Sequence, residues 1–326
     1  MPGWRRDWRG SRGRFHGDLG YLLFKKGELP RALEEQRRAL ALSQRQTGAE
    51  ALRDTHIILG DLARTLSATG AKAEALEHYR GAVAAAEARL ALLPADPTAR
   101  RDLNNGTSNL AEALRGAGQL AEATRAMSQV VAFDEEKLRA DEKDAQAMAD
   151  LAWDLDMMAQ LAFDGGRFDE ALALERRAHD LAAARLRQNP TSFQARKTVA
   201  EGWSELSDIL AKLDRLDEAV AMEERAIAEL EHLREQNPSQ TRVAQLLAVA
   251  RAAGAELYER TAQGARGPAR AAAWRKARAS SRLALQAWGE LERLGALDAD
   301  KRPRLAASAA VLVRSDAALA RKEHRP

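Results

Sequence analysis

The chain has 326 residues, a net charge of +3 and 30% charged residues. A single hydrophobic core stops growing near ~250–300 residues, which argues against one compact globule and for either two domains or an array of repeats. The sequence contains no cysteine, which excludes disulfides, cysteine-ligated metal centres and a cysteine nucleophile. Alanine, leucine, arginine and glutamate dominate the sequence, and since these residues favour helices, the composition predicts an all-α protein.

The first 13 residues form a basic N-terminal arm, and the aromatic residue Phe15 lies just after it. Its arginines alternate with Trp4 and Trp8, a pattern that suits contact with nucleic-acid phosphates and bases or with an anionic membrane surface. We favour an unstructured arm over both, so no nucleic-acid partner is expected. The segment lacks the apolar run of a secretory signal, and no stretch of ~18 apolar residues predicts a membrane span. A cytoplasmic location is therefore expected.

A repeat of 48 residues follows the arm. Four segments align without gaps, and a fifth copy at 19–33 precedes them. Apolar residues recur at helical spacing on both sides of a central turn, which predicts two antiparallel helices of roughly 20 residues in each unit. The turn residues, which lie 48 positions apart, are Gly70, Gly118, Gly166 and Asp214.

The repeats divide the chain into six predicted units and a cap. In the sixth unit Ala273 lies about six residues later than the period predicts, and a loop at 261–270 is expected to absorb this insertion. The predicted units are 14–52, 53–100, 101–148, 149–195, 196–243 and 244–300, and an amphipathic capping helix with its tail covers 301–326.

Small residues occupy one fixed position in each predicted helix. The first helices carry Gly20, Ala63, Ala111, Ala159 and Ser207, and the second helices carry Ala32, Ala75, Ala123, Ala171 and Ala219. This pattern resembles the tetratricopeptide repeat (TPR), with Trp203 at the characteristic tryptophan position of that family. The resemblance implies an α-α superhelix of about six long helix pairs, whose first helices line a concave groove that binds peptides of partner proteins.

The 48-residue form, with 96–105 opening a first helix, resembles the C-terminal TPR arrays of bacterial serine/threonine protein kinases. The sequence contains no G-x-G-x-x-G loop, no H-R-D and no D-F-G, so phosphoryl transfer is not expected. Its six histidines are scattered, and its adjacent carboxylates do not share a helix face. No catalytic residue, cofactor or metal site is therefore expected.

Counting from the small residues gives the side chains expected in the groove. Trp153 beside amides is typical of an interaction hot spot, although Trp153 and Phe163 could instead pack against neighbouring helices. Glu201, Glu205 and Asp208 favour basic peptides, unless they merely form a solvated helix face. The expected groove residues are Arg64, Asn105, Asn109, Glu112, Arg115, Trp153, Asp156, Met157, Gln160, Phe163, Glu205 and Asp208.

The expected function is that of a non-catalytic scaffold or adaptor that binds a protein or peptide in the groove. An alternative is a detached regulatory or substrate-recruiting tail of a bacterial signalling enzyme such as a serine/threonine kinase. Self-association through the irregular first unit is a third possibility.

Overall fold

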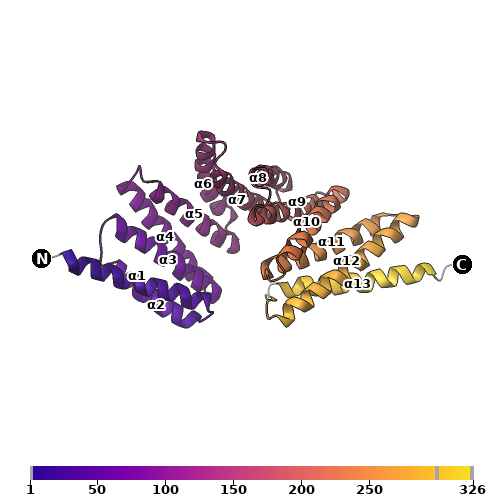
Figure 1. The fold of residues 1–326 in the computed structure, drawn as a ribbon, viewed down its shortest axis with the longest axis horizontal. Helices are drawn as coiled ribbons and strands as arrows, with labels where there is room; N and C mark the ends of the chain where they lie inside the picture. Colours follow the sequence, from indigo (N-terminus) through magenta and orange to yellow (C-terminus); the bar gives the residue numbers. More distant parts are fainter. Residues whose placement is uncertain (1–2, 298–300, 324–326) are drawn as a thin grey trace. The chain divides into compact units, whose positions relative to one another are not determined.

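The computed structural model describes residues 3–297 and 301–323, and the regular elements in these ranges are α-helices (Figure 1). The all-α fold of paired helices predicted from the sequence is confirmed. Thirteen helices follow one another in the described ranges: α1 (Gly3–Lys25), α2 (Leu29–Ser43), α3 (Ala49–Ala68), α4 (Lys72–Leu92), α5 (Pro97–Gly116), α6 (Leu120–Ala140), α7 (Ala145–Asp164), α8 (Phe168–Gln188), α9 (Phe193–Lys212), α10 (Leu216–Gln236), α11 (Thr241–Gly264), α12 (Gly267–Arg293) and α13 (Arg302–Glu323).

The chain divides into two compact units, Met1–Glu136 and Lys137–Pro326. In the first unit α1 packs on α2 and α3 packs on α4, and α4 also contacts α5. In the second unit the pairs are α7 with α8, α9 with α10 and α11 with α12. No helix in the described part of the chain is long and apolar enough to cross a membrane.

The N-terminal arm differs from its prediction, because α1 begins at Gly3 and is helical through the segment that we expected to be unstructured. The side chains of Trp4 and Trp8 lie outside the described residues. Phe15 is exposed on α1, where its ring contacts His16 edge-on.

The first helices of successive pairs begin at a strict interval of 48 residues, at Ala49, Pro97, Ala145, Phe193 and Thr241. They begin three or four residues before the unit boundaries drawn from the sequence. A capping side chain marks the start of α5, α7 and α9: Asp96 accepts a hydrogen bond from the backbone of Thr98 at 2.8 Å, Asp144 accepts one from Gln146 at 2.8 Å, and Ser192 accepts one from Ala195 at 3.3 Å.

The insertion in the sixth unit lies in the helices and not in a loop at 261–270. The helix α11 has 24 residues and α12 has 27, so that only Ala265 and Arg266 remain between them. Pro268 falls in the first turn of α12, where its missing N–H is not needed.

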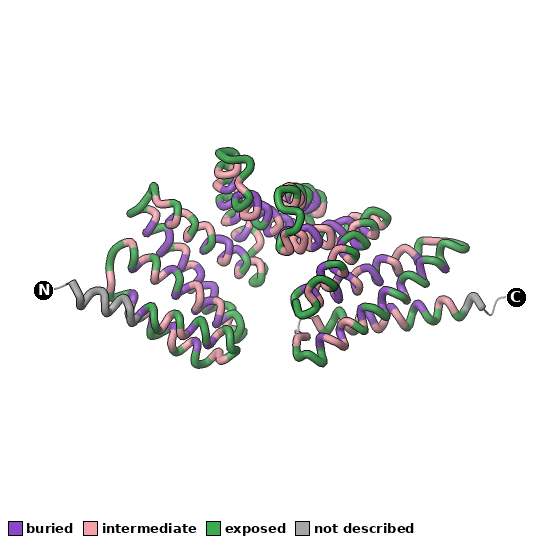
Figure 2. Tube along the Cα trace, viewed as in Figure 1, coloured by how far each residue is buried: buried purple, intermediate pink, exposed green. Residues whose placement is uncertain are grey.

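The small residues of both helices in each pair are buried along the contact between them (Figure 2). At Gly20 even a methyl group would lie 2.6 Å from the Cγ of Gln36. In the fifth pair Ser207 takes the small position, and its hydroxyl donates a hydrogen bond to the carbonyl of Ala219 at 2.9 Å. The helix pairs therefore pack at the positions that the sequence pattern predicted.

The helix α13 covers the end of the array, where it packs on α12 and α11. Val311 is fully buried in a cluster with Ala255, Trp274 and Ala277, and Ser315 is buried beside it. Val313 and Asp316 are exposed on α13, and Asp316 lies 3.6 Å from Arg278 of α12.

Candidate functional site

The second unit contains a cavity of about 550 Å³, which lies among α7, α8, α9 and α11 and reaches Arg304 in the first turn of α13. Its volume is in the range of ordinary ligand pockets. Five of the expected groove residues line it: Trp153, Asp156, Gln160, Glu205 and Asp208. Glu201, the third member of the predicted acidic group, lines it as well.

Trp153 presents a large aromatic surface to this cavity. The side chain is 47% exposed, although tryptophan is usually one of the most buried residue types. The exposed indole and its place in the cavity wall favour the groove position over the alternative, in which Trp153 packs between helices.

Ion pairs occupy one end of the cavity. Lys197 donates a hydrogen bond to the Oε2 of Glu201 at 2.8 Å, and Arg242 lies 3.5 Å from its Oε1. On α7 the amide of Gln160 donates to the Oδ2 of Asp156 at 2.9 Å. These contacts orient the polar side chains along the cavity wall.

Glu175 on α8 is the most unusual side chain in the wall. It is 2% exposed, and its Oε2 has no hydrogen-bond partner among the described residues. Burial, followed by the neighbouring carboxylates of Asp156 and Glu205, raises the pKa of Glu175 from 4.5 to about 10. The carboxyl is therefore protonated at neutral pH.

His179 lies one turn further along α8, and its ring stacks at 5.6 Å on that of Trp203. Burial lowers the pKa of His179 below its usual 6.5, so the imidazole is neutral at physiological pH. A Cβ on Gly202 would lie 2.9 Å from the Nδ1 of His179 and 3.4 Å from the Oε1 of Glu175. Glycine therefore allows α9 to approach α8 closely at this point.

A second buried glutamate, Glu223, lies on α10. It is 1% exposed, and burial and the carboxylate of Asp208 raise its pKa to about 8. Burial also raises the pKa of Asp208, while the positive charges of Arg304 and Lys212 lower it. Arg304 lowers the pKa of Glu223 in the same way, so the capping helix supplies a cation to these two carboxyls.

Two of the expected groove residues in this unit belong to the packed interior. Met157 is 5% exposed, because this apolar side chain lies on the buried side of α7. Phe163 packs at the edge of the core cluster that includes Leu206 and Ile209, and its ring makes an edge contact with Phe168 at 5.4 Å. Phe163 therefore packs against neighbouring side chains, whereas Trp153 is half-exposed.

The remaining expected residues lie in the first unit, on α3 and α5. Arg64 pairs with Asp61 of its own helix at 3.0 Å, and Asn105 and Glu112 are exposed. Asn109 and Arg115 are half-buried. The structure does not bring these residues into the cavity that contains Trp153.

The family model of the tetratricopeptide repeat matches residues 58–90, which lie within the α3–α4 pair. The fold is that of a tetratricopeptide-repeat protein. No curated protein sequence matches the chain.

Three solved structures share the TPR fold, and at their sequence identities the likeness shows the fold alone. The nearly identical TPR-like repeats of a candidate kinesin light chain from Podosopora anserina give a TM-score of 0.53 at 21% identity, over 71% of this chain and 99% of theirs. The apo form of RapI gives a TM-score of 0.55 at 11% identity, over 95% of this chain and 98% of RapI. A Rap protein complexed with Competence and Sporulation Factor gives a TM-score of 0.51 at 12% identity, over 95% of this chain and 76% of the Rap protein.

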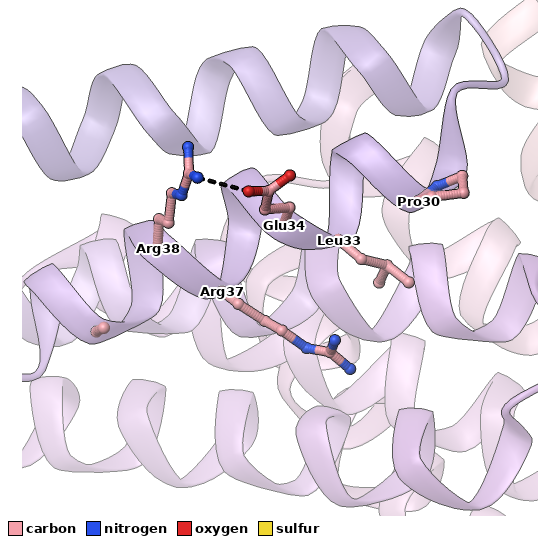
Figure 3. A pocket seen from close by; sticks show the side chains of 6 residues that line it. Pro30, Leu33, Glu34, Arg37 and Arg38 are labelled. Atoms are coloured by element: carbon pink, nitrogen blue, oxygen red, sulfur yellow. Dashed lines mark hydrogen bonds and ion pairs between the residues drawn. The ribbon is translucent and has the colours of Figure 1, made fainter.

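The surface of the first unit has a shallow depression along α2 (Figure 3). Leu33 and Arg37 line it, and Arg38 forms an ion pair with Glu34 one turn away. These charged side chains are exposed on a single helix, so this depression lacks the enclosed polar groups of the cavity in the second unit.

Sequence reasoning missed Glu175, Gly202 and Arg304. A signal for Glu175 was present, because the same repeat position holds Met127, which is fully buried, and then Glu223. A glutamate at a position that is apolar in the preceding repeat departs from the apolar pattern of the helices. Aligning the repeats at their 48-residue spacing shows this departure. No group of three metal-ligating side chains occurs among the described residues.

Proposed function

We propose that this chain is a non-catalytic adaptor that binds a peptide or a peptide segment of another protein in the cavity of its second unit. One observation carries the proposal: a half-exposed tryptophan lines a cavity that also receives polar side chains from three successive first helices, α7, α9 and α11. An aromatic anchor surrounded by oriented polar groups is the usual composition of an interaction hot spot.

A row of polar groups on α9 supports a peptide as the ligand. Gln194, Thr198 and Glu201 follow one another along α9 on the cavity wall, at spacings that place them on one helix face. Amide, hydroxyl and carboxylate groups in such a row suit the repeating N–H and C=O groups of an extended backbone. A structure with the same fold was solved with Competence and Sporulation Factor bound, which also supports a binding role.

The test compares capture of partners by the wild-type chain and by Trp153→Ala. We expect a protein that the wild type retains from a lysate of the source cells to be lost with Trp153→Ala. Leu283→Ala is the matched control, since Leu283 is exposed to a similar extent on α12 and does not line the cavity. This control should retain the same protein.

Thermal unfolding makes this test decisive. Because Trp153 is half-exposed, its replacement should change the melting temperature by less than about 4 °C, which corresponds to roughly 1 kcal/mol for a unit of this size. A larger fall would show that Trp153 is a core residue. Retention of the same partner by a folded Trp153→Ala would contradict the proposed site.

The resemblance to kinase-associated repeat arrays favours a bacterial protein, and the sequence predicts a cytoplasmic location. A catalytic kinase domain encoded immediately upstream would make it the substrate-recruiting tail of a signalling enzyme. Self-association is a further possibility, favoured by the exposure of Phe15 and Leu22, which lie two turns apart on α1. Size-exclusion chromatography over a range of concentrations tests it, and a strict monomer would contradict it.

A further inference from the structure

The cavity contains a carboxyl group that is buried and incompletely bonded. Glu175 faces the cavity, yet its Oε2 has no hydrogen-bond partner in the part of the chain that the structure describes. Such an atom loses its hydration without compensation, which costs free energy. A ligand group that reached this oxygen would recover that cost.

Space for such a group exists beside the carboxyl. Glu175 and Gly202 both line the cavity, and a side chain on Gly202 would press on Glu175 and His179, since its Cβ would lie 3.4 Å from the Oε1 of Glu175 and 2.9 Å from the Nδ1 of His179. A larger residue at position 202 would therefore disturb the wall of the cavity at Glu175.

The charges around the cavity are distributed unevenly. The carboxylate of Glu201 is paired with Lys197 and Arg242. The capping helix provides Arg304 for Asp208 and Glu223. The groups that face Glu175 are the carboxylates of Asp156 on α7 and Glu205 on α9 and the neutral imidazole of His179 on its own helix.

This part of the cavity is therefore complementary to a positive charge. Trp153 lies in the same wall, three residues before Asp156 on α7. The face of an indole attracts ammonium and guanidinium groups and also covers their hydrocarbon stems. An acidic end beside an exposed aromatic surface matches the two chemical parts of a lysine or arginine side chain.

We propose that the cavity recognises one lysine or arginine of a bound peptide, whose stem lies against Trp153 and whose charged end pairs with Glu175. The inference rests on the proposed peptide-binding function and specifies the residue that the peptide must carry. A peptide supplies both a stem for the indole and a backbone for the polar row on α9, whereas a free polyamine supplies charges and a hydrocarbon chain but no peptide backbone.

Binding of this residue exchanges a proton for a cation. In the empty cavity the Glu175 carboxyl is neutral, which avoids an unpaired buried charge. When an ammonium or guanidinium group arrives, the carboxyl ionises, its proton passes to the solvent, and the carboxylate pairs with the cation. One bound peptide therefore releases up to one proton at pH 8, well below the pKa of about 10 in the empty cavity.

The test uses mixtures of acetylated, amidated hexapeptides in which one position is fixed as lysine, arginine, glutamine or leucine. At one of the six positions, the mixtures with fixed lysine or arginine should bind the wild type at least tenfold more tightly than the mixture with fixed glutamine at that position. Glu175→Gln should abolish this preference while still binding the glutamine mixture. Calorimetry of the best lysine mixture in phosphate and in Tris at pH 8 should show proton release by the wild type and none by Glu175→Gln.

Glu223→Gln is the matched control, because Glu223 is an equally buried glutamate one repeat later that does not line the cavity. It should keep both the preference and the proton release. A cation preference that survives in Glu175→Gln would overturn the role of Glu175 and leave the peptide-binding function intact. Failure of all mixtures to bind the wild type would overturn both. If spermidine binds through Glu175 more tightly than any hexapeptide mixture, the occupant is a polyamine and this proposal is wrong.

Discussion

Glu175 and Glu223 occupy the same position in successive helix pairs, 48 residues apart, and each is buried with its Oε2 lacking a hydrogen-bond partner. The equivalent residue of the preceding pair is the fully buried Met127. The position therefore belongs to the interior of the array, and two glutamates have replaced an apolar side chain there. Their environments differ, because Ser204 donates a hydrogen bond to Glu223 at 3.3 Å and Arg304 lowers its pKa.

The first prediction concerns stability and pH. Between pH 4.5 and about 10 the folded chain holds a proton on Glu175 that the unfolded chain has lost. The free energy of unfolding should therefore fall as the pH rises, by up to about 1.4 kcal/mol per pH unit. Glu175→Gln removes the titrating carboxyl and with it this loss of stability, so the free energy of unfolding of the variant should rise relative to that of the wild type from pH 5 to pH 9. Urea unfolding at pH 5, 7 and 9 measures the difference.

The two glutamates should also differ from each other in this experiment. For Glu223 the folded pKa is about 8, so the gain from Glu223→Gln should grow only up to about pH 8 and then level off. Glu235→Gln, a change at an exposed residue of α10, serves as the control and should follow the wild type at every pH. Parallel pH profiles for Glu175→Gln and the wild type would contradict the buried, protonated state of Glu175.

The second prediction tests the contact between paired helices. Ala159 is buried where α7 packs on α8, so Ala159→Glu would force a long charged side chain into a space that holds a methyl group. We expect a loss of about 3 kcal/mol or more, from overpacking and an unpaired buried charge. Ala173→Glu, an exposed change on α8, should stay within about 0.5 kcal/mol. Equal stability of the two variants would show that the repeat register is wrong.

Much of this fold could be predicted from the sequence because its strongest signals are periodic. The glycines of the turns and the small residues of the helix contacts recur every 48 positions, and they fixed the number of helix pairs. The starts of the first helices were harder to predict, because they depend on single capping side chains such as Asp96 and Asp144. Capping side chains lie outside the apolar pattern, so the predicted units began three or four residues late.

The candidate site could be predicted only in part, and for a related reason. Counting along the first helices found Trp153, Asp156 and Gln160, since groove side chains recur with the repeat. The same count also selected Met157, which is buried. Spacing alone does not distinguish a side chain that faces the groove from a neighbour on the same helix that faces the core. Glu175 was missed because it lies on a second helix, and a glutamate there reads as a solvated residue until its burial is known.

The third prediction uses two glycines of the same turn. Gly118 has a φ of +75°, whereas Gly116 is the last residue of α5 and would have no atom within 4 Å of an added Cβ. Gly118→Ala should destabilise the chain by about 1–2 kcal/mol, because a residue with a Cβ enters the left-handed region at a cost. Gly116→Ala should instead stabilise it by about 0.5–1 kcal/mol, since it restricts the unfolded chain. Thermal unfolding of both variants measures these shifts, and shifts of the same sign would contradict the turn geometry.

The last prediction concerns a buried ion pair in the first unit. Arg89 is 3% exposed, and its guanidinium donates hydrogen bonds to Asp102 at 2.7 Å and to Asp96 at 2.9 Å. Asp102→Ala would leave a buried cation with one of its partners missing, and we expect a loss of about 3 kcal/mol. The exposed pair of Arg80 and Glu122, at 3.2 Å, provides the comparison, and Glu122→Ala should cost less than about 1 kcal/mol.

The dependence of stability on salt concentration further distinguishes these two ion pairs. Mobile ions screen exposed charges and hardly reach buried ones, so the effect of Glu122→Ala should vanish between 0.05 and ~0.5 M NaCl while that of Asp102→Ala persists. Urea unfolding of the wild type and both variants at the two salt concentrations measures this. A loss for Asp102→Ala that disappears with salt would mean that water reaches Arg89, and the pairing of α4 with α5 would then depend on apolar contacts alone.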